Sequence, residues 1–174
     1  SKPETGTLIA RLKEETGLDI THVWHEDDGF RKCRILNKAI LQAAHDYIVF
    51  TDGDCIPHRD FLKTHAAIAT PGRFASGSYF RLSLPASEAI ERSHVESGEC
   101  FDPEWLQAQG MPRSKQMRRL VASPLVDRIM SPLTMRSCTL KGGNAGVWRS
   151  DLLKVNGYDE RLGYGGQDRE LGVR

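Results

Sequence analysis

Two aspartates, Asp52 and Asp54, stand one glycine apart directly after a strongly apolar segment, residues 47–51. A segment that is apolar at every position is typical of a strand buried on both faces in the middle of a sheet. We expect the two carboxylates where this strand ends, at the edge where open α/β sheets bind ligands. Two closely spaced carboxylates suit a hard divalent cation held near a phosphate. A solvent-exposed turn is the alternative, because Asp-Gly is also a common turn pair.

A second group of charged residues surrounds an expected helix start. A short strand is expected over residues 20–24, followed by an acidic loop and then a helix that runs to about residue 45. Four cations lie in the first turns of that helix: Arg31, Lys32, Arg34 and Lys38. Basic residues at a helix start oppose the helix dipole, so a negative ligand such as a diphosphate is expected to compensate them. A solvated charged face is the alternative.

The C-terminal part contains two clusters of glycine. Three of the five residues from 142 to 146 are glycines, which let a backbone come close to a flat group such as a sugar ring. The second cluster, residues 163–166, leads into a helix whose first turn carries Asp168 and Glu170. A carboxylate at a helix start stays ionised, because free amide donors and the helix dipole favour the anion. Such an acid is either a helix cap or a general base.

The remaining periodicity predicts short elements around these motifs. Asp102, Pro103 and Gly110 have the residue types of a helix cap, a first helical position and a helix stop. Residues 83–135 are otherwise weakly patterned and are the candidate acceptor region, with a surface insertion without chemistry as the alternative for any single residue in it. The other predicted elements are helices at 7–16, 60–69, 87–97, 103–109 and 150–155, and a strand at 73–82.

Composition narrows the class of protein. A chain of 174 residues fits one domain, and its 24 basic and 23 acidic residues nearly cancel, which argues against a nucleic-acid partner. No apolar run is long enough for a membrane span, so no transmembrane segment is expected. Four cysteines without paired short spacing indicate idle thiols in a reducing cytoplasm rather than a zinc site or disulfides: Cys33, Cys55, Cys100 and Cys138.

Residues 23–37, the Asp52-Gly53-Asp54 triplet and residues 142–170 together resemble the inverting glycosyltransferases of family 2, which have the GT-A fold. The end of the chain resembles a galactosyltransferase C-terminal motif, Gly-Trp-Gly-Gly-Glu-Asp, with Tyr164 and Gln167 in place of Trp and Glu. The resemblance implies an α/β fold with a Rossmann-like, mixed and mostly parallel sheet flanked by helices. We expect residues 1–174 to be one such domain, truncated at both ends and lacking the first strand.

This resemblance also implies a reaction and a set of roles. The reaction is an in-line displacement at the anomeric carbon of a nucleotide sugar, expected to be a UDP-sugar, by a glycan or lipid-linked acceptor. Asp54 and Asp52 are expected to hold Mn²⁺ or Mg²⁺. Asp168 is the expected general base, with Glu170 as its substitute. Tyr164 and Gly166 are expected at the acceptor. The implied donor contacts are Asp28, Phe30, Lys32, Arg34, Asp52, Gly143 and Asn144.

The resemblance further implies a role in bacterial surface polysaccharide synthesis, in the cytoplasm or peripherally at the inner face of the membrane. Two alternatives belong to other classes. A nucleotidyltransferase that forms sugar nucleotides also places an acid-bound metal at a strand end, but normally begins with a glycine-rich basic loop that this sequence does not show. A non-catalytic nucleotide- or glycan-binding domain would have replaced one of the acids with an assigned role, whereas Asp52, Asp54, Asp168 and Glu170 are all present here.

Overall fold

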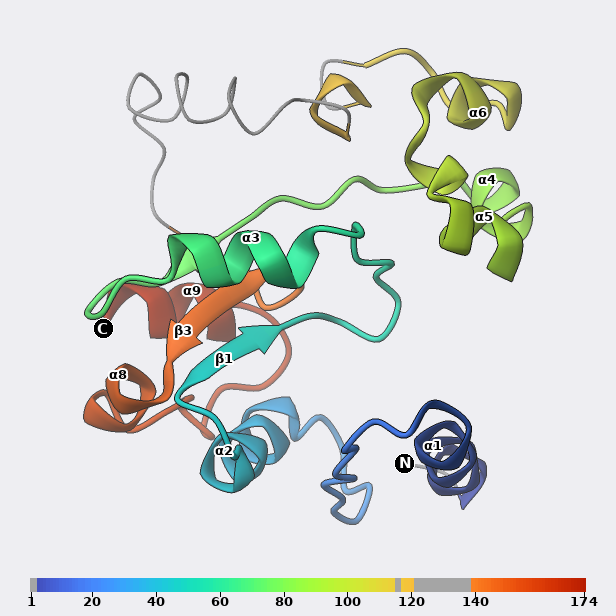
Figure 1. Ribbon diagram of the computed structural model, residues 1–174. Helices are drawn as coiled ribbons and strands as arrows, with labels where there is room; N and C mark the ends of the chain where they lie inside the picture. The colour runs from blue at the N-terminus through green and yellow to red at the C-terminus, as the bar shows by residue number, and fades with distance from the viewer. Residues whose placement is uncertain (1–2, 115–116, 121–138) are drawn as a thin grey trace.

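The computed structural model describes residues 3–114, 117–120 and 139–174, whose arrangement Figure 1 shows. A sheet with the strand order β1-β3-β2 lies at its centre. Its strands are β1 (Tyr47–Phe50), β2 (Ala75–Ser76) and β3 (Ala145–Trp148). Both pairings are antiparallel. The expected mostly parallel sheet is therefore not found in the described part of the chain. Residues 145–148 were not predicted as a strand, yet they form the middle one and run against both neighbours.

Alternation along the strands divides the side chains between two faces of the sheet. Ile48 and Phe50 pack on one face against a buried cluster that includes Ile40, Leu152 and Leu171. These three residues belong to helices α2 (Lys32–Gln42), α8 (Arg149–Lys154) and α9 (Gln167–Val173), respectively. Helix α3 (Phe61–Ile68) covers the opposite face, as Figure 1 shows.

The contacts of Gly146 in β3 confirm that α3 packs on this opposite face of the sheet. A side-chain carbon added at Gly146 of β3 would lie 2.2 Å from the Tyr47 hydroxyl and 2.7 Å from Nδ1 of His65 in α3. A glycine is therefore required where α3 packs on the middle strand. The sheet lies between two layers of helices, which agrees with the α/β class expected from the sequence.

Strand β1 differs from its prediction in burial. All four of its residues are half-buried, not buried on both faces as their apolar run indicates. Within the described residues, β1 pairs with β3 alone, so its other edge is open. The two aspartates nevertheless follow directly after the strand, as expected.

The helices agree with the sequence pattern better than the strands do. Helix α1 (Pro3–Thr16) starts earlier than predicted, α2 ends at Gln42 and not near residue 45, and α3 and α8 lie within one residue of their expected bounds. Residues 20–24 form no strand, and the strand expected at 73–82 is reduced to β2. Within the described residues, 20–24 pairs with no strand, and in 73–82 only Ala75 and Ser76 pair with β3.

A second, smaller group of helices follows β2. Helix α6 (Pro103–Ala108) has the predicted cap, since Asp102 accepts a hydrogen bond of 3.0 Å from the Glu104 amide. The single helix expected at 87–97 is instead two, because Glu91 and His94 form a capping box that starts a new helix. These two helices are α4 (Leu84–Glu88) and α5 (Arg92–Ser97). Two 3₁₀ turns flank α6: η1 (Glu99–Phe101) precedes it and η2 (Met117–Leu120) follows it.

These helices have their own hydrophobic cluster, formed by Ala86, Leu106, Met111 and Met117. We call residues 83–120, as far as they are described, the helical lobe. The lobe touches the loop after β1 where the rings of His58 and Phe101 lie 5.1 Å apart in an edge-to-face arrangement. The rest of the expected acceptor region, residues 121–135, lies outside the described residues, as does Cys138. None of the described helices has both the length and the apolar character that a bilayer crossing requires.

Candidate active site

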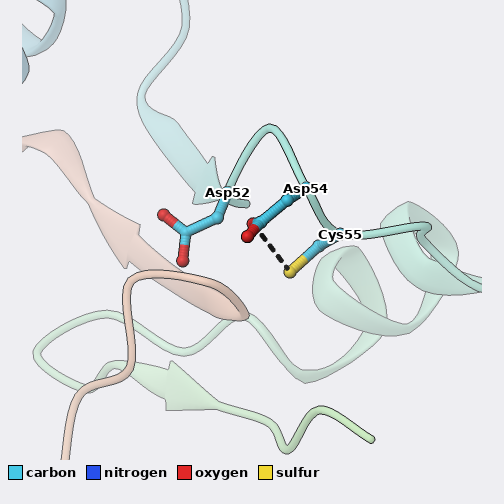
Figure 2. A group of neighbouring side chains, drawn as sticks. All are labelled: Asp52, Asp54 and Cys55. Atoms are coloured by element: carbon cyan, nitrogen blue, oxygen red, sulfur yellow. Dashed lines mark hydrogen bonds between the residues drawn. The ribbon is translucent and has the colours of Figure 1, made fainter. Parts of the chain in front are cut away.

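A tight turn after β1 brings the two predicted metal ligands together. The Cys55 amide donates a hydrogen bond of 3.1 Å to the Asp52 carbonyl, which closes the turn around Gly53 and Asp54. One ligand atom from each of Asp52, Asp54 and Cys55 lies within 4.8 Å of the other two. Figure 2 shows these three side chains at the end of the strand. The turn considered as an alternative is thus present, and it is what clusters the carboxylates.

The chemistry of this cluster fits a hard divalent cation. Asp54 is exposed and Asp52 is half-buried, so their oxygens are accessible to an ion that prefers carboxylate ligands. The Cys55 thiol donates to Oδ1 of Asp54 at 3.9 Å. Burial raises the pKa of Cys55, and the charges of Asp54 and Asp52 raise it further. The thiol therefore stays protonated, and the two aspartates are the residues that would hold Mn²⁺ or Mg²⁺. Sequence reasoning treated Cys55 as idle, although it directly follows the aspartates.

Lys32 is the cation that the structure places among these acids. Its Nζ lies 2.8 Å from Oδ1 of Asp52. Burial alone would lower the pKa of Lys32, but the hydrogen bond and charge of Asp52, with the charges of Asp168 and Asp54, raise it above its ordinary value. Two neighbouring acids and a third that lies more than 100 residues further along the chain therefore act on one ammonium group.

Asp168 approaches the site through the first glycine cluster. Its Oδ2 accepts a hydrogen bond of 3.1 Å from the Gly142 amide. A side-chain carbon added at Gly142 would lie 2.8 Å from Oδ1 of Asp168, and one added at Gly143 would lie 2.9 Å from Oδ2 of Asp52. The same short backbone segment thus touches both carboxylates. The need for glycine here follows from the close approach of these two acids, which the sequence pattern alone did not reveal.

Glu170 lies away from this group. It stands two residues after Asp168, which corresponds to about 200° around a helix. Its carboxylate pairs with Arg174 at 2.6 Å. Arg174 also donates hydrogen bonds to the carbonyls of Val155 and Gly157. The structure therefore places Glu170 in a contact between the end of α9 and the segment after α8, and it does not bring Glu170 to Asp52 and Asp54.

Asn144, predicted to contact the donor sugar, is held by the protein itself. Its Oδ1 lies 2.9 Å from Nε2 of His65, and its Nδ2 donates a hydrogen bond of 3.0 Å to the Ser78 carbonyl. Its backbone carbonyl accepts from the Gly77 amide at 2.8 Å. The side-chain amide thus joins β3, α3 and the segment after β2. This contact fixes the glycine cluster next to Asp52.

Two aromatic residues from separate loops meet near the start of α2. The rings of Phe30 and Tyr164 lie 5.1 Å apart in an edge-to-face arrangement, and Tyr164 is 90% exposed. Tyr164 precedes Gly165 and Gly166, which both have positive φ angles that favour glycine. The pair therefore brings together one predicted donor residue and one predicted acceptor residue.

Two other predicted donor contacts point elsewhere. Asp28 is 82% exposed in its side chain and pairs with Arg31 at 2.9 Å. Arg34 is exposed and lies two residues after Lys32, about 200° around α2. Two of the four cations at this helix start, Arg31 and Lys32, are thus compensated by acids of the chain. Arg34 is exposed, and a solvated charge at this position is the alternative that the sequence left open.

The geometry defines the class of protein. It is an α/β domain in which paired aspartates follow a strand, a lysine lies among them, and a glycine segment holds a third acid. The chain belongs to Glycosyl transferase family 2, whose sequence profile matches residues 1–118. Membership implies a GT-A fold, of which the described residues show a small antiparallel part. The matched range contains Lys32, Asp52 and Asp54 and ends before Gly142 and Asp168.

A further similarity covers less of the chain. The small ribosomal subunit protein eS4 of Methanothermobacter thermautotrophicus is 29% identical over 97 residues, which are 55% of this chain and 35% of that protein. The chain therefore spans about a third of the length of this curated relative. A partial match of this kind does not show membership of a family.

Proposed function

We propose that this chain transfers a sugar from a nucleoside diphosphate donor, a UDP-sugar, to a hydroxyl group of a glycan or lipid-linked acceptor, with inversion at the anomeric carbon. Family membership supports a glycosyltransferase. The observation that carries the finer proposal is that Asp52 and Asp168 both lie against the Gly142-Gly143 backbone, with Lys32 paired to Asp52. These residues lie up to 136 positions apart in the sequence, so the fold rather than the local sequence brings them together.

The donor diphosphate is assigned to the side of the site that carries Asp52, Asp54 and Lys32. A divalent cation held by Asp54 and Asp52, Mn²⁺ or Mg²⁺, would offset the charge that develops on the leaving diphosphate. Lys32 supplies a positive charge from the chain itself at the same place. The Gly142-Gly143 backbone lies between this group and Asp168, where the donor sugar would be placed.

Asp168 is assigned as the general base. In the displacement, the acceptor oxygen bonds to the anomeric carbon as the bond from that carbon to the diphosphate oxygen breaks, and the acceptor proton passes to Asp168. The Gly142 amide holds Oδ2 of the carboxylate and leaves this oxygen a second lone pair. Asp168 is half-buried as a residue and its Oδ1 is buried, so Oδ2 is the oxygen that we assign to the incoming hydroxyl. General-base assistance of this kind is worth about 10²–10⁴-fold in rate.

The acceptor is assigned to the side of Tyr164 and the helical lobe. Tyr164 presents an exposed ring that can stack on a sugar, and Gly166 gives the following helix start its backbone conformation. The contact between His58 and Phe101 places the lobe beside the loop that carries Asp54. We further assign the reaction to bacterial surface polysaccharide synthesis, in the cytoplasm or at the inner face of the membrane.

The test is incubation of the protein with a panel of nucleotide sugars and either Mn²⁺ or Mg²⁺, followed by measurement of nucleoside diphosphate release. Release that requires both the cation and Asp54, and that rises with added glycan acceptor, would support the proposal. Thermal stabilisation by a nucleotide without any release would instead favour a non-catalytic binding domain. Release of pyrophosphate from a nucleoside triphosphate and a sugar phosphate would indicate a nucleotidyltransferase.

A further inference from the structure

Tyr158 is a buried tyrosine that the proposed reaction has not yet used. It is 2% exposed, and its backbone is held on both sides by one side chain of α2. Asn37 donates a hydrogen bond of 2.9 Å to the Tyr158 carbonyl and accepts one of 2.8 Å from the Tyr158 amide. The ring packs edge-to-face against Phe50 of β1, with centroids 6.2 Å apart. These contacts fix the ring, and with it the direction of the hydroxyl group.

The Tyr158 hydroxyl and Oδ1 of Asp168 are both buried, and neither has a hydrogen-bond partner at short distance. Burial raises the pKa of Tyr158, and the charge of Asp168 is the next largest contribution. Tyr158 also packs in the same buried cluster as Leu171, which lies three residues after Asp168 on α9, so the two groups belong to the same part of the core. A buried polar atom without a partner destabilises a folded protein, and here one group is a donor and the other an acceptor. A hydrogen bond between them would satisfy both.

We propose that the Tyr158 hydroxyl donates a hydrogen bond to Oδ1 of Asp168 and so orients its carboxylate, with Oδ2 held by the Gly142 amide and directed to the acceptor. Tyr158 is then a positioning residue, which acts on the acceptor only through Asp168. The proposal rests on the proposed function for the role of Asp168 as a base. The hydrogen bond itself can be tested without any turnover.

Other charged and titratable groups also act near Asp168. The charge of Asp168 raises the pKa of Lys32 in α2. The pKa of Cys33 is raised mainly by burial, and then by the charges of Asp159 and Asp168. Asp52 acts on Lys32 and on Tyr158. All of these groups remain when the Tyr158 hydroxyl alone is removed. A change seen in Tyr158→Phe is therefore due to the loss of one donor.

The first experiment follows the tyrosine Cζ carbons by NMR in protein labelled at that position. The chain has four tyrosines, and Tyr→Phe variants assign their signals. We expect Asp168→Ala to move the Tyr158 signal while the Tyr47 signal stays in place. Asp54→Ala is the matched control, because this acid belongs to the same site and is not among the groups that act on Tyr158. A Tyr158 signal that Asp168→Ala leaves in place would overturn the proposal.

The second experiment compares the pH dependence of kcat/KM for Tyr158→Phe and Tyr47→Phe. Tyr47 is the matched control, since its hydroxyl is also buried without a partner but its pKa is raised by burial alone. We expect Tyr158→Phe to move the acidic limb of the profile to higher pH, because a lost donor disfavours the ionised carboxylate. We expect no such movement for Tyr47→Phe. Equal profiles for both variants would contradict the proposal. Absence of turnover in the wild-type protein would count against the proposed function, and the NMR result would still decide whether the hydrogen bond exists.

Discussion

Nζ of Lys32 lies 2.8 Å from Oδ1 of Asp52, so an ammonium group of the chain pairs with one of the two aspartates that are expected to bind the cation. A lysine in this position is expected to weaken the binding of the cation and to strengthen the binding of the diphosphate. It competes with a divalent cation for Asp52, and it supplies positive charge to a donor diphosphate. The two effects can be separated, because one concerns the metal alone and the other the nucleotide.

The first prediction is that Lys32→Met binds Mn²⁺ about fivefold more tightly in the absence of nucleotide, which corresponds to roughly 1 kcal/mol for a half-exposed ion pair. The same variant is expected to bind a nucleoside diphosphate about tenfold more weakly, because a charge-assisted contact is lost. Electron paramagnetic resonance of free Mn²⁺ and calorimetric nucleotide titration measure the two affinities. Arg34→Met is the control, since Arg34 is exposed on another side of α2. Weaker Mn²⁺ binding by Lys32→Met would contradict the competition.

The second prediction separates the two possible metal ligands that follow Asp52. Asp54→Ala is expected to weaken Mn²⁺ binding by at least about tenfold, because a carboxylate ligand is removed. Cys55→Ser is expected to change it by less than about twofold, because a protonated thiol is a poor ligand for a hard cation. Titration of both variants with Mn²⁺ checks this. A loss of similar size in the two variants would show that Cys55 is itself a ligand.

The position of the paired aspartates was predictable because it depends on local sequence. An apolar run followed by Asp-Gly-Asp fixes both the strand and the point where it ends, and the helices around it have caps and stops of their own. The antiparallel direction of β3 was not predictable in this way. Its segment, Ala145–Trp148, is short and contains a glycine, and its direction depends on where the chain returns after more than 90 residues.

In the site as well, local features were predictable from the sequence and contacts between distant residues were not. The approach of Asp168 to Gly142 joins residues 26 positions apart, and the Lys32–Asp52 pair joins residues 20 apart. The resemblance to a family supplied candidate acids, but it did not indicate that Glu170 pairs with Arg174 or that the Asn144 side chain contacts His65. Contacts of this kind depend on packing between elements, which no local pattern encodes.

The third prediction concerns the assignment of the base. Asp168→Asn keeps the shape of the side chain and removes its ability to accept a proton, so transfer is expected to fall by about 10²–10⁴-fold. Nucleotide affinity is expected to stay within about twofold of the wild type, because Asp168 is assigned to the acceptor side. Single-turnover transfer and calorimetric titration measure the two quantities. Near-normal turnover of Asp168→Asn would exclude Asp168 as the base.

The fourth prediction is that Glu170→Gln lowers stability without a comparable loss of transfer. The Glu170 and Arg174 side chains are each 33% exposed, and their pair is expected to contribute about 0.5–1 kcal/mol. Its loss corresponds to a fall in Tm of about 1–4 °C for a chain of this size. Thermal unfolding and the transfer assay, run on the same preparation as Asp168→Asn, compare the two acids. A rate loss as large as that of Asp168→Asn would make Glu170 the better candidate for the base.

The fifth prediction tests the close approach of the glycine segment to the carboxylates. A methyl group at Gly142 would lie between 2.8 and 3.1 Å from both oxygens and the carboxyl carbon of Asp168, so Gly142→Ala must displace that carboxylate or its own backbone. We expect destabilisation of about 1–3 kcal/mol together with a large loss of transfer. Gly163→Ala is the matched control, because an added carbon there has no atom within 4 Å. Denaturant unfolding and the transfer assay measure both effects. If Gly142→Ala were as stable and as active as Gly163→Ala, the carboxylate of Asp168 would not lie against this backbone, and the proposed site would lose the contact that joins its two halves.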